Sequence, residues 1–517
     1  MPRALRSFRC RTPRWGAKLG TISTIESLAR TFGLSASAGH GRDLTIRQRD
    51  IDEPLQLDSL SAERLALLHV NADGIIAVRS CVIEELVIDH CTADALLITN
   101  SRIGRLIIRN TPVNCEVTVN ESTVETLDVH SCGSMRFEGV RIADTVQISG
   151  MRGHLHLKRL RAAALTVRSQ VAGGRQRRPE VHLENLHVTE AVTLDDLWLA
   201  SLTLDDIDAS VLVLRRVRVD TPFRGTGVRC REGLRINGLV VPGEANTLED
   251  SDVRGAVDVR GLRHSATLPT QRPAPDTTGT PPSARTAELA FRSSTICRLT
   301  AAAEDGSPVV VELENTTVTD ALAVPSGPAR YRLAGSSTIN EVDLGDAVFR
   351  NGTQVIGFLD RVFTRVSPGA LEAVRATLSR RRRTTEEDQI YYLTRQREAR
   401  ERPLVQRLVA NGLLGGVLGW GVRARNPARA LAAAMLSTAA VLHVTGAVRS
   451  PGAEGLGDFS AASKALVLAC ALWLNVGTGA PSELKTHGWT ALAVCFAVGG
   501  MVFVTLTVGI MIRKLVR

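Results

Sequence analysis

The chain has 517 residues, of which 22% are charged and 44% are apolar, and its formal net charge is +10. This length favours two or more structural units, and the composition excludes a wholly disordered chain. Aromatic residues make up only 4% of the chain, which favours a regular architecture filled with aliphatic side chains. The excess basic residues are clustered and lack interleaved aromatic residues. They are typical of membrane topology signals rather than of a nucleic-acid interface.

Residues 1–43 are rich in arginine and serine and form a basic leader that we expect to be disordered. No apolar segment follows the first basic residues, so a secretory signal is not predicted. The composition fits an organellar transit peptide or a disordered bacterial leader, and we favour the second. The chain has nine cysteines but no Cys-x-x-Cys pair, so neither a zinc site nor a disulfide framework is predicted. Buried thiols in a reducing cytosol are the simpler interpretation.

Residues 44–360 repeat a short apolar pattern. Triplets such as Leu86-Val87-Ile88 and Leu96-Leu97-Ile98 recur at a step of about ten residues, and the step later tightens to five. Neither a helix nor simple strand alternation has this period, whereas a solenoid whose coil closes after about twenty residues does. The positions at the five-residue step are Val192, Leu197, Leu202, Ile207, Leu212 and Val217, followed two residues on by Leu194, Leu199, Leu204, Leu214 and Val219.

These repeats resemble the pentapeptide-repeat family of right-handed β-solenoids. The resemblance implies stacked coils around one aliphatic core, and a more irregular parallel β-helix is the structural alternative. A proline-rich insertion near residues 264–287 and a shorter loop at Gly173–Pro179 interrupt the repeat. We expect this domain to dock a cytosolic protein or to sense a ligand, or to serve as a rigid scaffold.

Residues 367–427 form a charged connector, in which we expect two helices. Ser367 is a candidate N-cap before Pro368, and a second helix start is predicted at Thr384. The run Asp388–Arg400, followed by Gly419–Pro427, is similar to the connector of bacterial proteins that join pentapeptide repeats to a potassium-channel-like module. The tyrosines of this run fit helix packing equally well, and Trp420 suits an interfacial anchor.

Residues 428–517 carry three apolar segments. We expect a first transmembrane span at 428–448, a short re-entrant helix at 460–474 and a second span at 489–512. Basic residues flank both spans on the same side, so both termini are predicted to be cytosolic. These topology residues are Arg423, Arg425 and Arg429 before the first span, and Arg513 and Lys514 after the second.

The segment after the short helix reads Asn475-Val476-Gly477-Thr478-Gly479. It resembles the Thr-Val-Gly-Tyr-Gly selectivity filter of two-transmembrane potassium channels, in which backbone carbonyls replace the hydration shell of the ion. The resemblance implies a homotetramer with a permeant monovalent cation, K⁺ or Na⁺, and a hinge at Gly499 and Gly500. Asn475 and Thr478 depart from the potassium pattern, which leaves the selectivity open.

The sequence therefore predicts a multi-pass cell-membrane protein that is a cation channel subunit with a cytosolic β-solenoid. The alternative is a membrane-anchored β-solenoid scaffold that does not conduct ions, in which the glycine pair serves only for close helix packing. No cofactor, resident metal or enzyme motif is predicted. The lipid bilayer and further copies of the chain are the predicted partners.

Overall fold

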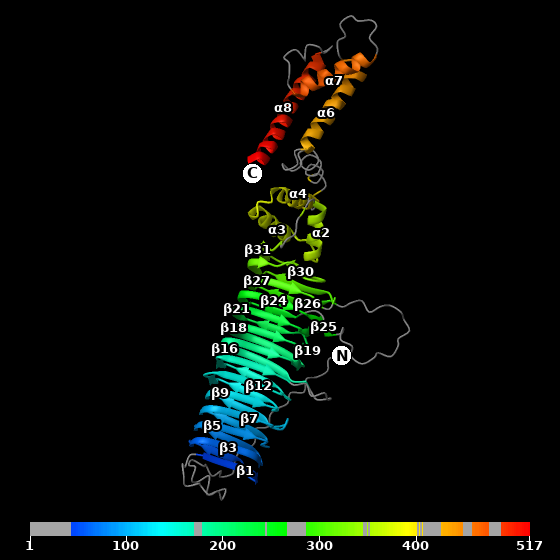
Figure 1. Cartoon of the computed structure of the whole chain (residues 1–517). Helices are drawn as coiled ribbons and strands as arrows, with labels where there is room; N and C mark the ends of the chain where they lie inside the picture. The colour runs from blue at the N-terminus through cyan, green and yellow to red at the C-terminus, as the bar shows by residue number, and fades with distance from the viewer. Residues whose placement is uncertain are drawn as a thin grey trace, which may run out of the picture. The chain divides into compact units, whose positions relative to one another are not determined.

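The computed structural model describes residues 43–169, 178–242, 246–265, 286–304, 306–344, 349, 352–400, 403, 406, 425–447, 458–474 and 487–516. In this part of the chain, parallel strands come first and six helices follow (Figure 1). The chain divides into two compact units. Met1–Asp346 with Asp360–Gly369 is the solenoid unit, and Ala347–Leu359 with Ala370–Arg517 is the helical unit.

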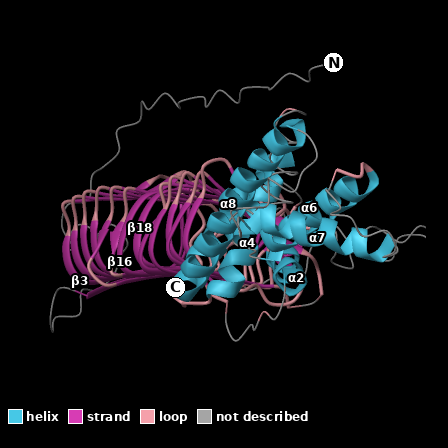
Figure 2. Ribbon diagram, turned by 90° about the horizontal axis from the view of Figure 1, so that it is seen from above, coloured by secondary structure: helices cyan, strands magenta, loops and turns pink. Residues whose placement is uncertain are grey.

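The solenoid unit is a β-solenoid, as predicted, and it has about 13 turns. Its strands stack in parallel columns, as Figure 2 shows along the magenta strands. The first column contains β1 (Asp43–Ile51), β3 (Ser61–Ala72), β5 (Val82–Asp89), β7 (Arg102–Arg109), β9 (Thr123–His130), β12 (Thr145–Ser149), β15 (Ala164–Arg168), β16 (Glu180–Asp195), β18 (Ser201–Arg215), β21 (Arg229–Asn237), β24 (Asp252–Arg260), β27 (Thr295–Ala302), β29 (Thr317–Leu322) and β31 (Thr338–Val342).

The long strands β16 and β18 also belong to a second column. Its other members are β2 (Leu55–Asp58), β4 (Ile75–Arg79), β6 (Ala95–Thr99), β8 (Glu116–Asn120), β10 (Met135–Glu138), β13 (Leu155–Lys158), β20 (Arg224–Thr226), β23 (Thr247–Glu249), β26 (Ala287–Arg292), β28 (Val309–Glu314) and β30 (Ala329–Ala334). Two short strands, β11 (Arg141–Ile142) and β14 (Arg161–Ala162), bridge β9 and β16. A small sheet contains β17 (Trp198–Leu199), β19 (Arg218–Val219), β22 (Val240–Val241) and β25 (Arg263–His264).

Aliphatic ladders run along the solenoid through the strand register. One ladder occupies equivalent positions of the first column: Leu44, Leu65, Leu86, Leu106, Leu127, Val146, Leu165, Val192, Leu212, Leu234, Val257, Leu299, Leu322 and Val342. All of them are buried, and so are both sets of the predicted five-residue step. Each coil thus buries its apolar residues against its neighbours, and this burial is the main driving force for stacking.

Tight corners with left-handed backbone conformation end the strand segments. One series of these corners consists of Ser59, Ser80, Asn100, Glu121, Arg159, Asn185, Asp206, Asp250, Ser293 and Asn315, with glycine at 139, 227 and 335. Asparagine, aspartate and glycine tolerate this conformation best. The backbone N–H of a corner residue donates to a carbonyl of the next coil, as in Ser59 N to Arg79 O at 2.9 Å and Ser80 N to Thr99 O at 3.0 Å.

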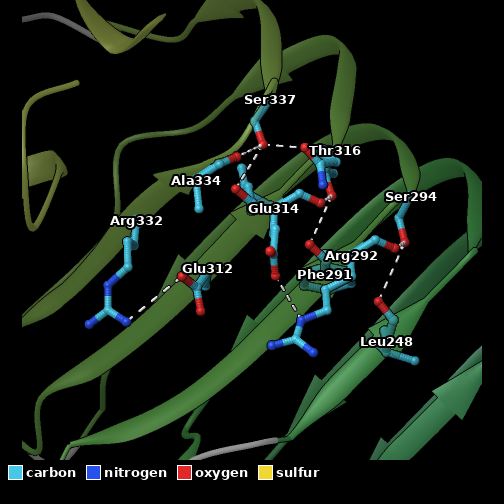
Figure 3. A network of polar contacts seen from close by, with 12 residues as sticks. Leu248, Phe291, Arg292, Ser294, Glu312, Glu314, Thr316, Arg332, Ala334 and Ser337 are labelled. Atoms are coloured by element: carbon cyan, nitrogen blue, oxygen red, sulfur yellow. Dashed lines mark hydrogen bonds and ion pairs between the residues drawn. The ribbon is translucent and has the colours of Figure 1, made fainter. Parts of the chain in front are cut away.

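A ladder of small polar side chains follows these corners inside the solenoid, and we call it the corner ladder. It includes Cys81, Ser101, Ser122, Ser251, Ser294, Thr316 and Ser337. All seven side chains donate to a carbonyl oxygen, as Ser294, Thr316 and Ser337 do in Figure 3. Five of them, Cys81, Ser101, Ser122, Ser294 and Ser337, also accept a hydrogen bond from a backbone N–H of the preceding coil. The ladder satisfies backbone groups that would otherwise be buried without partners.

The solenoid unit ends in a short cap. Thr364 donates its backbone N–H to the carbonyl of Tyr331 at 2.8 Å, and Phe363 packs its ring 6.5 Å from that of Tyr331. The sequence placed the end of the solenoid at residue 360, whereas β31 ends at Val342 and α2 (Gly352–Val362) follows. The buried residues Val355, Leu359 and Val362 have helical spacing there, which explains the helix.

The other helices are α3 (Pro368–Arg380), α4 (Thr384–Arg400), α6 (Arg425–Val444), α7 (Asp458–Leu474) and α8 (His487–Val516). The first two begin at Pro368 and Thr384, the two starts that the sequence predicts. Arg382 adopts a left-handed conformation with φ 55° between them, and Arg383 N donates to Leu378 O at 2.9 Å. These contacts end α3 and turn the chain into α4.

Candidate functional site

Helix α8 is the longest apolar helix that the structure describes. Its segment Ala491–Ile512 has 22 residues, and only 11% of its most apolar stretch is buried. At 1.5 Å per residue this segment is about 33 Å long, enough to cross a hydrocarbon layer of about 30 Å. The exposed apolar residues of α8 are Leu492, Val494, Val498, Met501, Val502, Leu506, Val508, Met511 and Ile512. By length and composition, α8 is the one helix of the described residues that qualifies as a membrane span.

The other two apolar helices are shorter. The first predicted span, 428–448, overlaps α6, which ends at Val444 and whose apolar part is Ala428–Val444. The predicted re-entrant helix, 460–474, lies within α7, and its re-entrant position stays a prediction. Gly446 ends α6 with φ 55°, and its N–H donates to His443 O at 3.1 Å. The apolar part of α6 is below the length expected of a span, so the two-span count remains a prediction.

Helix α7 packs against both α6 and α8 through small side chains. The buried cluster consists of Ala439, Leu442 and Ala447 from α6 and the turn after it, Ala465, Leu468, Ala469 and Leu472 from α7, and Ala493 from α8. Trp489 and Phe496 of α8 pack against the cluster. Small residues of this kind allow close approach of helix backbones where apolar solvent provides no hydrophobic driving force.

Trp473 joins the three helices at the last turn of α7. Its indole Nε1 donates to Thr438 Oγ1 of α6 at 2.9 Å, and its ring stacks on Phe496 of α8 with centroids 5.7 Å apart. Phe503 approaches the same ring edge-on at 6.3 Å. No motif of the sequence marks Trp473 or Thr438. A tryptophan on an apolar helix needs a partner for its N–H, and this requirement is the signal that could have found the pair.

Gly500 of α8 lies directly against the end of α7. A Cβ atom at this position would overlap the carbonyl oxygen of Trp473, and a Cβ at Gly499 would lie 3.6 Å from the indole ring. The structure therefore gives the glycine pair a role in close helix packing. The proposed hinge at Gly499 and Gly500 remains a prediction.

The end of α7 lies level with the middle of the long apolar segment. Gly500 is near the centre of Ala491–Ile512, and Trp473 is the second-last residue of α7. The last turn of α7 therefore lies beside the middle of α8. The same turn contacts α6, since Trp473 donates to Thr438.

The filter-like residues Asn475, Val476, Gly477, Thr478 and Gly479 follow α7 and lie outside the described residues, as do Trp420 and Arg423. Among the topology residues, Arg429 is exposed in the first turns of α6. Arg425 begins α6, and Arg513 and Lys514 lie near the end of α8, but their side chains are outside the described part.

The connector tyrosine Tyr391 lies between two arginines. The guanidinium carbon of Arg375 is 4.9 Å from the ring centroid and that of Arg395 is 5.2 Å from it. Arg375 also forms an ion pair with Glu387 at 3.6 Å, which joins α3 to α4. Tyr391 thus packs the two connector helices together, and the resemblance of its run to a channel connector stays a prediction.

The solenoid surface carries a concentrated ion cluster on β16. Asp195 accepts hydrogen bonds from Arg215 at 2.7 and 2.6 Å and from Arg216 at 3.2 Å. Arg168 lies 3.5 Å away on the preceding coil. The hydrogen bonds from Arg215 outweigh the burial of Asp195 and lower the pKa of its carboxyl group. This cluster joins three coils through one carboxylate.

The solenoid cysteines Cys81, Cys91, Cys115, Cys132 and Cys230 are buried. Burial raises the pKa of Cys91 to about 11 and that of Cys230 to about 12. Cys91 and Cys132 donate to the carbonyls of Leu67 and Ile108 at 3.3 and 3.6 Å. Such thiols are poor nucleophiles and act as small packing residues.

Comparison of the chain with protein-family models, with curated proteins and with solved structures found no match. The class of protein therefore rests on the fold and the site. The described residues define a β-solenoid protein with a helical C-terminal region that contains one candidate membrane helix.

Proposed function

We propose that the chain is a subunit of a cation-conducting membrane pore that carries a β-solenoid. The observation that supports this proposal most is the position of Trp473, at the end of α7, against Gly500 near the middle of Ala491–Ile512. A short apolar helix that ends halfway along a membrane span delivers the following backbone to the middle of the bilayer. Irregular backbone is tolerated at that depth only where it is buried in protein or lines a water-filled path.

The proposed pore assigns residues 475–479 to the ion path. The C-terminal end of α7 would direct its negative dipole toward a permeating monovalent cation, K⁺ or Na⁺. Four chains would surround the path, since a filter of this kind needs four strands around one axis. The exposed apolar residues of α6 and α8 would then face lipid or neighbouring subunits, with both termini in the cytosol.

Ion flux from liposomes tests this proposal directly. The purified full chain is reconstituted, and K⁺ and Na⁺ efflux is compared for the wild type, a Gly477→Ala/Gly479→Ala variant and a Gly509→Ala control. Gly509 is a suitable control because nothing lies within 4 Å of a Cβ there. We expect flux in the wild type and the control and its loss in the double variant.

A membrane-anchored scaffold without conduction is the second candidate function. In this function the glycine pair serves only for close helix packing, which the contact of Gly500 with Trp473 accounts for without a hinge. Absence of flux from correctly folded protein would reject the pore. Flux that the double variant leaves unchanged would reject the assignment of residues 475–479 to the ion path. A particle mass that differs from four chains in detergent would reject the tetramer.

A further inference from the structure

Two histidines and a glutamate meet on the surface of the solenoid unit. His156 belongs to β13, and His182 and Glu184 belong to β16. The two strands pair in parallel with His156 opposite His182. Their rings meet edge-on with centroids 4.8 Å apart, and Glu184 follows His182 on the same face of the strand.

The three ligand atoms converge on one point. Nε2 of His156 and Nε2 of His182 each lie 3.6 Å from Oε2 of Glu184, and the three atoms lie within 4.8 Å of one another. Lys158 contacts the other carboxylate oxygen, Oε1, at 2.8 Å. Lys158 therefore orients the carboxylate and leaves Oε2 to the imidazoles.

His156 supplies a second, independent observation. Within the described part of the chain, its Nε2 atom is shielded from solvent and has no hydrogen-bond partner. A neutral imidazole nitrogen without a partner is the form that binds metal ions.

We propose that His156, His182 and Glu184 bind a divalent transition metal ion of the zinc class and clip two adjacent coils of the solenoid together. Two imidazoles and one carboxylate favour zinc, cobalt or nickel over magnesium or calcium, which prefer oxygen ligands. Tetrahedral zinc places its ligand atoms about 3.3 Å apart, so small side-chain rotations close the site. A fourth position is left for water or for a ligand from a partner.

The sequence spacing hides this site. His156 and His182 are separated by a longer stretch than a normal coil, because the intervening coil contains the insertion outside the described residues. Only the strand register brings them together. The sequence feature that could have indicated the site is the alternation of side chains along a strand. The segments His154-Leu155-His156 and His182-Leu183-Glu184 each place two candidate metal ligands on one strand face.

Metal binding to the full chain in detergent tests the proposal. After removal of metal with a chelator, Zn²⁺ binding is measured by equilibrium dialysis and Co²⁺ binding by visible absorption. The test variant is His156→Gln/His182→Gln, and a Glu184→Gln variant checks the carboxylate. The matched control is His187→Gln, which changes another histidine of β16 that pairs with Asp208 at 3.0 Å and lies outside the cluster.

We expect the wild type and the control to bind one more Zn²⁺ than the double variant, to give a tetrahedral Co²⁺ spectrum and to gain thermal stability with Zn²⁺. Glu184→Gln should weaken binding by about tenfold or more. Unchanged circular dichroism of the metal-free variants excludes misfolding as the cause. Equal Zn²⁺ binding by the double variant and the wild type, or no binding by the wild type at micromolar Zn²⁺, overturns the proposal.

Discussion

The carbonyl oxygen of Trp473 occupies the space where a side chain at Gly500 would begin. This contact fixes the end of α7 against the middle of α8, and a hydrogen bond from Trp473 to Thr438 fixes the same turn against α6. The packing of α7 against α8 thus depends on one position, Gly500, where a residue with a side chain does not fit.

Gly500→Ala should destabilise the helical unit. A methyl group would collide with backbone, which cannot rotate away, so α7 and α8 must separate. Overpacking of this kind costs about 1–3 kcal/mol or more. Thermal stability in detergent, followed by the monodisperse fraction on size-exclusion chromatography, measures the effect.

Gly509→Ala is the control for this change. Nothing lies within 4 Å of a Cβ at Gly509, and alanine is the better helix former, so stability should be equal or slightly higher. Equal stability of the two variants would show that the α7–α8 contact is absent in solution.

Asp195→Asn should destabilise the solenoid unit at neutral pH. The buried side chain would lose its negative charge while three arginines remain around it. Because these arginines stay partly hydrated, the loss of stability is limited. We expect a loss of about 1–2 kcal/mol from these charged hydrogen bonds. Urea unfolding monitored by the β-sheet circular dichroism signal measures the loss. The adjacent exposed residue provides the control, Asp196→Asn, whose ion pair with Arg216 is long at 3.8 Å.

The effect of Asp195→Asn should depend on pH in a defined direction. The pKa of Asp195 is lowered from 3.8 in the folded chain, so the unfolded state binds a proton first as the pH falls. The contribution of the carboxylate is fully present above this ordinary value and is lost as the pH falls through the folded pKa. The difference between wild type and variant should therefore shrink below pH 3.8. A constant difference from pH 7 to pH 3 would contradict this account.

Ser294→Ala should loosen the corner ladder locally. Ser294 Oγ accepts the backbone N–H of Ser251 at 3.2 Å. It donates to Arg292 O at 2.7 Å (Figure 3). Alanine leaves that N–H buried without a partner, at a cost of about 1–3 kcal/mol. Hydrogen exchange by mass spectrometry should accelerate in residues 246–265 and 286–304 and stay unchanged in residues 55–110.

Ser294→Cys is the matched control for the ladder. Cys81 holds an equivalent corner position with its thiol, where Sγ accepts the N–H of Leu60 at 3.4 Å. The cysteine variant should therefore retain most of the protection that alanine loses. If both variants exchange alike, the hydroxyl group is not what protects this corner.

The sequence alone predicted the solenoid, because each coil has to place aliphatic residues at the same few positions to bury them against its neighbours. The five-residue step from Val192 to Val217 marks such positions, and all of them are buried. The apolar helices were predictable for the same reason: hydrophobic content and length leave a visible pattern along the chain, as in Ala491–Ile512.

The contacts between distant residues depended on the strand register and on the helix packing. His156 and His182 become neighbours only when β13 pairs with β16, and Asp195 gathers arginines from the two neighbouring coils in the same way. The contact of Trp473 with Gly500 likewise depends on how two helices cross. The pattern of buried residues can be predicted from local sequence. Contacts between distant segments depend on the strand register in three dimensions, and insertions of variable length between the strands leave these contacts without a fixed sequence spacing.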